Sequence, residues 1–247
     1  MISVVIITRN EEANIKACLE SVQTVADEIV VVDAGSTDRT EEICRGFDVR
    51  FVTKDWINYS ANKNFANELA THPYILSLDA DERLSAELRT SILDKKDSLS
   101  GVFEFSRQSF YCGKWIRRCG WYPDYKVRLF PKDGSQWVGE FVHERLHYRE
   151  DASLQRLAGD LIHYTNYSLD DHLERIDRYS SLHAQSMLEK GKRASWYKLL
   201  FSPLYRFLKM YVLQQGFREG YLGFQLSIVS AFAVFLRYAK LKRLTND

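Results

Sequence analysis

The sequence lacks the features that define several common classes of protein. Its four cysteines (Cys18, Cys44, Cys112 and Cys119) form no C-x-x-C pair and no Cys/His spacing typical of a metal site. We therefore expect a reduced intracellular protein, with a Cys112–Cys119 disulfide as the alternative in an oxidising compartment. No G-x-G-x-x-G motif follows the first predicted strand, which argues against a dinucleotide-dependent oxidoreductase.

Long apolar runs are also missing. No stretch reaches the roughly 18 residues that a membrane-spanning helix needs, and the apolar run Leu226–Leu236 has eleven. The first predicted strand begins at residue 2, so we expect no signal peptide. Internal repeats and low-complexity segments are absent as well, and 247 residues suit one large domain or one domain with an appendage.

The charges are unevenly distributed along an otherwise ordinary globular composition of 45% hydrophobic and 27% charged residues. From Lys192 onward there are ten Lys or Arg and two acids, Glu219 and Asp247, a net charge of +8. Because the whole chain carries +1, residues 1–191 carry −7. A basic tail on an acidic body indicates that the tail meets an anionic surface.

Apolar runs alternate with amphipathic segments in the first 80 residues. Strands are predicted where β-branched and apolar residues run together, at Ile2–Ile7, Glu28–Val32, Val49–Val52 and Tyr74–Leu78. Helices are predicted between them, at Ala13–Val22, from Asp38 with Thr37 as its cap, and at Ser60–Ala70. This alternation predicts an α/β fold with a mostly parallel sheet flanked by helices.

The pattern changes in the rest of the chain. After a helix at Ser85–Leu93, two strands are predicted at Val102–Phe105 and Lys126–Phe130, separated by an aromatic and basic connection. From Leu169 onward we expect helices alone, at Leu169–Leu188, Ser195–Gln214 and Tyr221–Leu244. We therefore expect a catalytic domain over residues 1–165 and a helical C-terminal extension over residues 166–247.

Polar side chains follow the predicted parallel strands where each strand ends. Thr8, Asp33 and Lys54 follow the first three, and Asp79–Glu82 places three carboxylates after the fourth. Ligands of such sheets bind beyond the carboxyl ends of the strands. Clustered carboxylates need a positive charge nearby, and Mg²⁺ or Mn²⁺ takes such oxygen ligands and bridges to phosphates. The sequence therefore predicts a metal and phosphate site at this edge.

Three motifs in this order resemble those of family 2 glycosyltransferases, which are inverting enzymes of the GT-A fold. They are Val4–Glu12 (VVIITRNEE), Ile29–Asp38 (IVVVDAGSTD) and Leu76–Glu82 (LSLDADE). The TRNEE wording and the later Trp137–Glu144 (WVGEFVHE) are similar to the branch that contains bacterial lipopolysaccharide core β-glucosyltransferases. The resemblance covers residues 2–165 and extends more loosely over the helical tail.

The resemblance implies an enzyme that moves a hexose from a UDP-sugar, with Mg²⁺ or Mn²⁺, to a hydroxyl of a surface-glycan or lipopolysaccharide-core acceptor. The acceptor would be a saccharide or glycolipid at the inner face of the cytoplasmic membrane, where we expect a cytoplasmic, peripheral protein. Two alternatives stay open. A sugar nucleotidyltransferase would be expected to carry a glycine-rich phosphate loop, which Thr8–Glu12 lacks, and a catalytically inactive scaffold would bind nucleotide-sugar without turnover.

By this resemblance the donor nucleotide binds to the first half of the chain. Asp33 matches the aspartate that hydrogen-bonds uracil, while Thr8 and Asn10 match residues around the base and ribose, with Glu12 in the same loop. Gly35 would permit a close approach of the backbone to the ligand. The same residue types also suit an ordinary turn between a strand and a helix.

Three further residues are assigned to the diphosphate and metal by the resemblance. Lys63 matches a basic position that helps to hold the diphosphate, and Asp81 and Asp79 form a D-x-D pair. Asp81 would bind the metal directly, and Asp79 would contact ribose or metal-bound water. The metal would offset the charge of the diphosphate leaving group. The alternatives are a solvated lysine and a capping cluster for the helix near Ser85.

An inverting mechanism needs a general base that takes the proton of the acceptor hydroxyl. The candidates are Glu144, Asp124 and His143, and Glu144 is favoured because it lies in the VHE wording that matches the branch. His143 would alternatively orient a neighbour or touch the diphosphate. The E-D pair of other family members is absent here, so the base assignment stays open.

Two segments suggest further contacts. The connection Cys112–Tyr125 and its neighbours combine aromatic with basic residues, which suits a sugar platform with phosphate-binding cations or simple packing under a loop. The same mixture occurs in single-strand nucleic-acid sites, but no fold context supports one, so we expect no nucleic acid. The tail Phe201–Arg243 is apolar and basic, which predicts helices lying in a membrane interface or, alternatively, a subdomain packed on the core or on a second subunit.

Overall fold

The chain forms two compact units in a computed structural model that describes residues 1–139 and 144–246, without the side chains of Asn166 and Asn246. The first unit is Met1–Arg107 with Tyr125–Tyr164, and the second is Gln108–Asp124 with Thr165–Asp247. The second unit therefore takes in Gln108–Asp124 as well as the helical extension.

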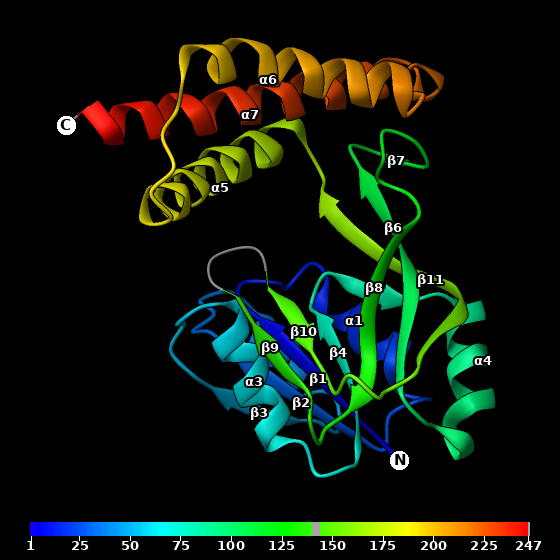
Figure 1. Cartoon of the computed structure of the whole chain (residues 1–247). Coiled ribbons are helices and arrows are strands. Elements are labelled where there is room, and N and C mark those ends of the chain that lie inside the picture. Colours follow the sequence, from blue (N-terminus) through cyan, green and yellow to red (C-terminus); the bar gives the residue numbers. More distant parts are fainter. Residues whose placement is uncertain (140–143, 247) are drawn as a thin grey trace. The chain divides into compact units, whose positions relative to one another are not determined.

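A mixed sheet organises the fold (Figure 1) and has nine strands among the described residues. Its order is β3–β2–β1–β4–β8–β6–β11–β5, with β7 paired to β6. The first four in this order are parallel neighbours: β1 Ile2–Thr8, β2 Glu28–Asp33, β3 Arg50–Thr53 and β4 Tyr74–Asp79. The four strands predicted in the first 80 residues are confirmed, and so is the α/β fold class.

Helices α1 Ile15–Val22, α2 Thr40–Cys44 and α3 Tyr59–Leu69 connect these strands. One expectation was wrong, because α2 begins two residues late and Thr37 does not cap it. The N-cap residue is Arg39, which makes no side-chain cap hydrogen bond, and the carboxylate of the preceding Asp38 accepts a hydrogen bond from the backbone N of Thr40 at 3.0 Å. The side chain of Asn58 caps α3 by accepting from the backbone N of Ala61 at 2.8 Å.

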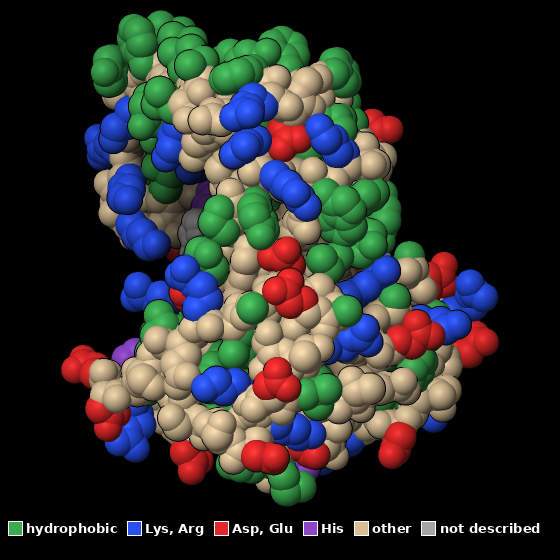
Figure 2. Space-filling model, turned by 90° about the vertical axis from the view of Figure 1, so that its right-hand side faces the viewer, with side chains coloured by type: hydrophobic (Ala, Val, Ile, Leu, Met, Phe, Trp, Pro, Cys, Tyr) green, Lys and Arg blue, Asp and Glu red, His purple; other side chains and the backbone are tan. Residues whose placement is uncertain are grey.

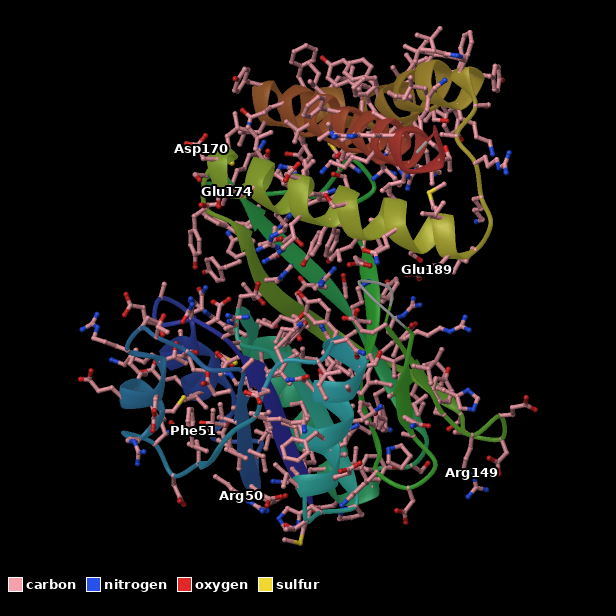
Figure 3. All side chains as sticks on the ribbon, turned by 90° about the vertical axis from the view of Figure 1, so that its left-hand side faces the viewer. Arg50, Phe51, Arg149, Asp170, Glu174 and Glu189 are labelled. Atoms are coloured by element: carbon pink, nitrogen blue, oxygen red, sulfur yellow. The ribbon has the colours of Figure 1, made fainter. Side chains whose placement is uncertain are left out.

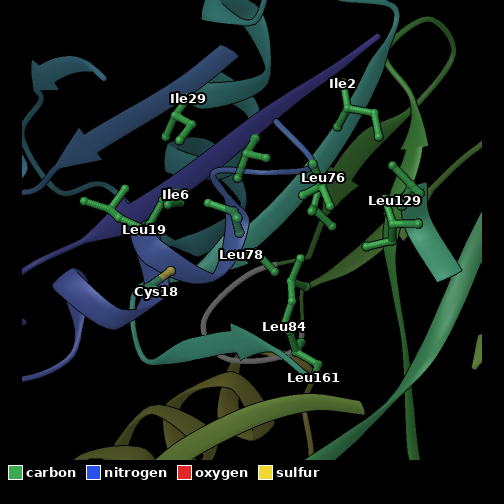
Figure 4. Packing of buried hydrophobic residues seen from close by; sticks show 14 of the residues in the cluster. Ile2, Ile6, Cys18, Leu19, Ile29, Leu76, Leu78, Leu84, Leu129 and Leu161 are labelled. Carbon is green, nitrogen blue, oxygen red and sulfur yellow. The ribbon is translucent and has the colours of Figure 1, made fainter. Parts of the chain in front are cut away.

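The main core lies around β1, whose seven residues are all buried. Figure 4 shows Ile2 and Ile6 of β1, Ile29 of β2, and Leu76 and Leu78 of β4 packed together with Leu19 of α1. A run of β-branched residues with both faces buried is what a central parallel strand requires, so the N-terminal run of the sequence specified this element.

The remaining strands were predicted only in part. β6 Val102–Tyr111 and β8 Asp124–Pro131 are longer than expected, and the short strands β5 Glu82–Leu84, β7 Lys114–Trp115, β9 Gln136–Val138 and β10 Arg145–His147 were missed. β11 Leu154–Asn166 was also missed, because Gly159 and Asp160 interrupt its apolar pattern. β8 pairs antiparallel with β4, and β11 with β5. Helix α4, Ala86–Lys95, begins at its cap Ser85 and is followed by a short 3₁₀ turn, Lys96–Ser98.

The second unit contains the long helices α5 Leu169–Glu189, α6 Trp196–Leu208 and α7 Tyr221–Asn246. Two short turns, η2 Lys209–Leu213 and η3 Gly216–Glu219, join α6 to α7. Helix α7 packs along both α5 and α6 (Figure 1). The three predicted C-terminal helices are thus present, and no strand follows β11 among the described residues.

The expectation that no segment is long enough to span a membrane was wrong by the criterion of length and composition. Tyr221–Thr245 of α7 forms one continuous helix of 25 residues that contains an 18-residue window with a mean hydropathy of 1.5, enough to cross a bilayer by that criterion alone. Counting the uninterrupted run Leu226–Leu236 missed it, because a helix continues through isolated polar residues such as Gln225 and Arg237.

The connection Cys112–Tyr125 packs largely within the second unit. Glu219 is buried, accepts a hydrogen bond from the backbone N of Arg117 at 3.0 Å and forms an ion pair with Lys114 at 2.8 Å. The ring of Trp121 meets the ring of Tyr111 edge-to-face with centroids 5.6 Å apart. Of the two possibilities for this connection, a sugar platform or simple packing under a loop, the contact of Trp121 with Tyr111 fits the packing.

Candidate active site

The loops that follow β1 and β2 begin at neighbouring positions, because Thr8 and Asp33 are register partners. Asp33 is almost fully buried, and one carboxylate oxygen accepts hydrogen bonds from the backbone N of Gly35 at 3.0 Å and of Ser36 at 2.8 Å. The other oxygen accepts from the hydroxyl of Ser36. Asp33, which is predicted to bind uracil, thus also stabilises the turn in which it lies. This is expected if Asp33–Ser36 is an ordinary turn between a strand and a helix.

Hydrogen bonds in both directions join these two loops. Asn10 accepts one from the backbone N of Thr37 at 2.8 Å, and its own backbone N donates to the hydroxyl of Ser36 at 2.8 Å. The backbone N of Glu12 donates to Asp38 at 3.0 Å, and the Glu12 carboxylate accepts from Arg39 at 3.1 and 3.3 Å. Asn10 and Glu12, which are predicted to lie near the donor nucleotide, therefore hold the loop that contains Asp33.

Two details of these loops bear on ligand binding. Gly35 has a φ of +76°, and a Cβ built on it would meet nothing within 4 Å, so the glycine is required by conformation rather than by crowding. The hydroxyl of Thr8 is buried and has no hydrogen-bond partner among the described residues. A buried hydroxyl of this kind is available to a bound ligand.

At the end of β4, Asp79 lies between two cations. Lys63 of α3, 1% exposed, places its Nζ 3.0 Å from one carboxylate oxygen of Asp79, and Arg128 of β8 lies 2.8 Å from the other. Burial alone would raise the pKa of Asp79, but Lys63 and Arg128 reverse this effect and hold it well below its usual range. Asp79 is therefore an ionised, tightly held carboxylate.

Glu82 is fully buried and contacts both Asp79 and Arg128. Its carboxylate lies 2.7 Å from Arg128 and accepts a hydrogen bond from the backbone N of Asp79 at 3.1 Å. The carboxylates of Glu82 and Asp79 raise the pKa of Arg128 further above its ordinary value, against the effect of burial. The third acid of the strand end is thus a structural partner of Arg128.

Asp81 turns to a different partner. Its carboxylate lies 3.2 Å from Nε2 of His163, which β11 brings alongside because His163 pairs in register with Glu82 of β5. The backbone N of Tyr164 donates to the Asp81 carbonyl at 3.0 Å. The D-x-D pair is therefore divided: Asp79 faces cations, and Asp81 faces an imidazole.

The residues around Asp81 fit a divalent metal that is bound together with a ligand. Among residues 1–139 and 144–246, no group of three or more His, Cys, Asp or Glu is arranged to hold a metal ion. The Asp81 carboxylate is nevertheless the kind of oxygen ligand that Mg²⁺ and Mn²⁺ take, and Mg²⁺ usually completes its coordination with phosphate oxygens and water. The imidazole of His163 would be an additional nitrogen ligand, which is a softer donor than Mg²⁺ prefers.

Of the three candidate bases, the structure brings Glu144 to this cluster. Its Oε1 lies 3.5 Å from Nζ of Lys63, so one lysine joins Asp79 to Glu144. Asp124 begins β8 and belongs to the second compact unit, whereas His143 lies outside the described residues. We refer to Lys63, Asp79, Glu82, Arg128 and Glu144 as the Lys63 cluster.

Trp137 of β9 supports the Lys63 cluster and was not predicted. Nζ of Lys63 lies 4.7 Å from the Trp137 ring centroid, a cation–π contact. Asn64 exchanges two hydrogen bonds of 2.8 Å with the Trp137 backbone, which fixes β9 beside α3. Arg128, expected among the phosphate-binding cations near the aromatic connection, instead pairs with Asp79 and Glu82. The contact of His163 with Asp81 was not predicted, because His163 lies on a strand far along the sequence.

Comparisons with known proteins bear on the family and the fold of this chain. The family model described as glycosyl transferase family 2 matches residues 3–149. The lipopolysaccharide core biosynthesis glycosyltransferase LpsC of Rhizobium meliloti is 32% identical over 254 residues, which cover 97% of this chain and 91% of LpsC.

Two solved structures share the fold at low identity. A mannosyltransferase from Pyrobaculum calidifontis, in complex with GDP-Man and Mn²⁺, matches with a TM-score of 0.52 at 15% identity. The match covers 97% of this chain and 86% of the mannosyltransferase chain. Glucosyl-3-phosphoglycerate synthase from Mycobacterium tuberculosis, in complex with Mn²⁺, UDP and phosphoglyceric acid, has a TM-score of 0.51 at 19% identity, covering 76% and 77%.

Proposed function

We propose a donor, a metal, an acceptor and a set of residue roles for this chain, which belongs to glycosyl transferase family 2. It is a glycosyltransferase with a GT-A-like fold. In our proposal it transfers a hexose from a UDP-sugar, with inversion, to a hydroxyl of a lipopolysaccharide-core or related surface-glycan acceptor. The observation that carries this proposal is the set of contacts at the end of β4. Asp79 lies between Lys63 and Arg128, and Asp81, two residues later, lies beside His163.

The nucleotide binds at the joined loops after β1 and β2. The hydrogen bonds that Asp33 receives from Gly35 and Ser36 hold its carboxylate in one position, where it accepts the uracil N–H as a further hydrogen bond. The buried hydroxyl of Thr8 gains a partner when base or ribose is bound. A neighbour of similar fold binds UDP, which supports a uridine donor.

Asp81 and His163 hold Mn²⁺ or Mg²⁺ in this proposal, and two neighbours of similar fold contain Mn²⁺. When bound, the metal offsets the charge that develops on the diphosphate as the sugar–oxygen bond breaks. Asp79, held by two cations, contacts ribose or metal-bound water. Lys63 lies on the same side and adds positive charge near the diphosphate.

Glu144 acts as the general base. In the transfer step, the acceptor oxygen forms a bond to the anomeric carbon while the bond from that carbon to the diphosphate breaks, and the hydroxyl proton passes to Glu144. Lys63 orients the Glu144 carboxylate through their 3.5 Å contact. This role requires the acceptor hydroxyl to come within hydrogen-bond reach of Glu144.

We further propose that the enzyme works as a peripheral protein at the inner face of the cytoplasmic membrane. The similarity to LpsC, named for lipopolysaccharide core biosynthesis, supports an acceptor of that kind. Growing core glycans are attached to lipid, so the acceptor is a glycolipid presented at a membrane surface.

A donor screen tests the function. Purified protein is heated with UDP-glucose, UDP-galactose, UDP-N-acetylglucosamine, GDP-mannose or dTDP-glucose in the presence and absence of Mn²⁺, and the melting temperature is recorded. A UDP-sugar should raise it, because a ligand that binds only the native state stabilises it, and should do so more strongly with Mn²⁺. A shift confined to GDP-mannose would contradict the donor proposal.

Product analysis separates the alternatives. Transfer releases UDP and lengthens the acceptor, whereas a nucleotidyltransferase consumes a nucleoside triphosphate and releases pyrophosphate. Binding of a UDP-sugar without turnover on any lipopolysaccharide-core acceptor would indicate a scaffold. The matched control for Asp81→Asn is Asp133→Asn, which changes an exposed carboxylate and should leave transfer intact.

A further inference from the structure

The outer side of α6 exposes an unusual amount of apolar surface. Helix α6 contains no buried residue, and large side chains along it and along η2 are between 46% and 72% exposed. We call this set the α6 apolar face; it consists of Trp196, Tyr197, Leu200, Phe201, Leu204, Tyr205, Leu208, Val212 and Leu213. Figure 2 shows hydrophobic side chains gathered over the helical unit in the upper part of the view.

The spacing of these residues makes the face continuous. They recur as two adjacent rows with steps of four, one from Trp196 through Leu200 and one from Tyr197 through Phe201, and such rows share one side of a helix. A contiguous apolar surface on a soluble protein marks a contact with another protein or with a membrane. Chemistry at its borders decides between the two.

Helix α7 extends the apolar surface. Tyr221, Phe224, Ile228, Phe232 and Phe235 recur along it at steps of three or four and are 40% to 75% exposed. Phe224 connects the two helices, since its ring lies 6.0 Å from that of Phe207 and 5.7 Å from that of Tyr211. The rows on α6 and α7 therefore belong to one packed pair of helices.

The segment that forms this surface carries almost only positive charge. Described residues 192–246 include ten Lys or Arg and one acid, Glu219. Glu219 is buried and paired with Lys114 at 2.8 Å, so it contributes no exposed negative charge. A complementary partner for the segment is anionic as well as apolar, which fits the interface of a bilayer that contains acidic lipids.

Helix α7 is poorly suited to span the bilayer in spite of its length. Near its C-terminal end, Nζ of Lys240 lies 2.7 Å from Asp177 and from Ser181 of α5, and near its start Gln225 donates to the hydroxyl of Tyr111 at 3.2 Å. Helix α5, along which it packs, exposes Asp170, Glu174 and Glu189 (Figure 3). A spanning α7 would either lose these contacts or draw a charged helix into hydrocarbon.

We propose that the helical unit lies in the plane of an anionic bilayer, with the α6 apolar face inserted among the lipids and the excess of Lys and Arg in this segment facing the acidic headgroups. Helix α7 supports α6 in this arrangement and does not cross the membrane. The inference rests on the proposed function in one respect, namely that the acceptor is presented at a membrane. It adds the inserting element, the lipid charge and the mode of attachment.

Vesicle co-sedimentation tests the surface. The full-length chain is mixed with one of two kinds of vesicle. The first is phosphatidylcholine alone, and the second contains in addition roughly 30% phosphatidylglycerol, which gives the surface a negative potential. We expect stronger binding to the anionic than to the neutral vesicles, and a loss of roughly tenfold per leucine for Leu200→Ser and Leu204→Ser.

Matched controls keep the experiment decisive. Ile57→Ser and Leu154→Ser change equally exposed apolar residues of the first unit and should not alter vesicle binding. Equal loss in these variants, or equal binding to neutral vesicles, would overturn the proposal. A wild-type dimer in sedimentation velocity that Leu200→Ser converts to a monomer, without any vesicle binding, would instead assign the face to a second copy of this chain.

The mode of attachment and the enzyme function are tested separately. Alkaline carbonate should release the protein from vesicles, since an interfacial helix is extractable and a spanning helix is not; retention would refute the non-spanning arrangement. The α6 variants should keep the melting-temperature rise that a UDP-sugar causes. If the wild-type protein shows no such rise, the proposed function fails while the vesicle results stand.

Discussion

Replacing Lys63 with methionine isolates the charge that joins Asp79 to Glu144. Methionine keeps the unbranched shape of the side chain beside Trp137, but it leaves Asp79 with Arg128 alone and Glu144 without its cation. Removing one partner of a fully buried ion pair costs about 3–5 kcal/mol. Because the Asp79 side chain is 27% exposed and keeps Arg128, we expect a loss of about 2 kcal/mol at pH 7.

The pH dependence of that loss follows from the pKa of Asp79. The pKa is lowered in the folded state, so the associated stability is present above the ordinary aspartate value of about 3.9 and is lost as the pH falls below it. In Lys63→Met the pKa of Asp79 moves back toward its ordinary value. The stability difference from wild type should therefore stay constant as the pH falls from 7 to the pKa of Asp79 in the variant, which Arg128 still lowers, and shrink only below that pKa.

Urea unfolding followed by circular dichroism between pH 3.5 and 7 measures this difference. Lys54→Met is the matched control, because Nζ of Lys54 lies over the Phe65 ring and forms no ion pair among the described residues; its effect should stay within about 0.5 kcal/mol. A loss in Lys63→Met below about 0.5 kcal/mol at pH 7 would refute the placement of Lys63 as the counter-ion of Asp79.

Three other predictions concern the site. Asp81→Asn and His163→Ala should each remove the extra stabilisation that Mn²⁺ gives to UDP binding, as measured by calorimetry with and without the metal, and should leave metal-free UDP binding within about threefold; an unchanged Mn²⁺ effect in both would exclude this pair as the metal site. Glu144→Gln should lower kcat by about 10²–10⁴ while the UDP-sugar still raises the melting temperature, and if Asp124→Asn has the larger effect, Asp124 is the base. Gly35→Ala should cost about 1–2 kcal/mol of stability because φ is +76° there, and a melting temperature equal to wild type would contradict that conformation.

The parallel half of the fold was predictable because its signals are local. Ile2–Thr8 is an unbroken β-branched run, and Asp33 and Asp79 each follow such a run directly, so the sheet edge and its polar residues could be placed together. The family of the chain was predicted from the order of the motifs rather than from any one residue. Local pattern and tertiary structure agree in this region.

The antiparallel half was less predictable, because its partners are set by pairing between distant strands. Arg128 sits in an alternating strand where either face could be buried, and the sequence does not show that its face meets Asp79 and Glu82. His163 lies in β11, whose apolar pattern is broken by Gly159, and it reaches Asp81 only through the pairing of β11 with β5. Long-range register of this kind leaves little local trace.

The hydrogen bonds between the loops after β1 and β2 have a consequence for changing the donor. Asn10 and Thr37, Glu12 and Arg39 connect the two loops through backbone as well as side-chain groups. Exchange of one loop alone for that of an enzyme with another nucleotide would strand these groups and distort the turn that holds Asp33. The two loops depend on each other structurally, so an experiment that changes the proposed donor specificity should exchange both loops together.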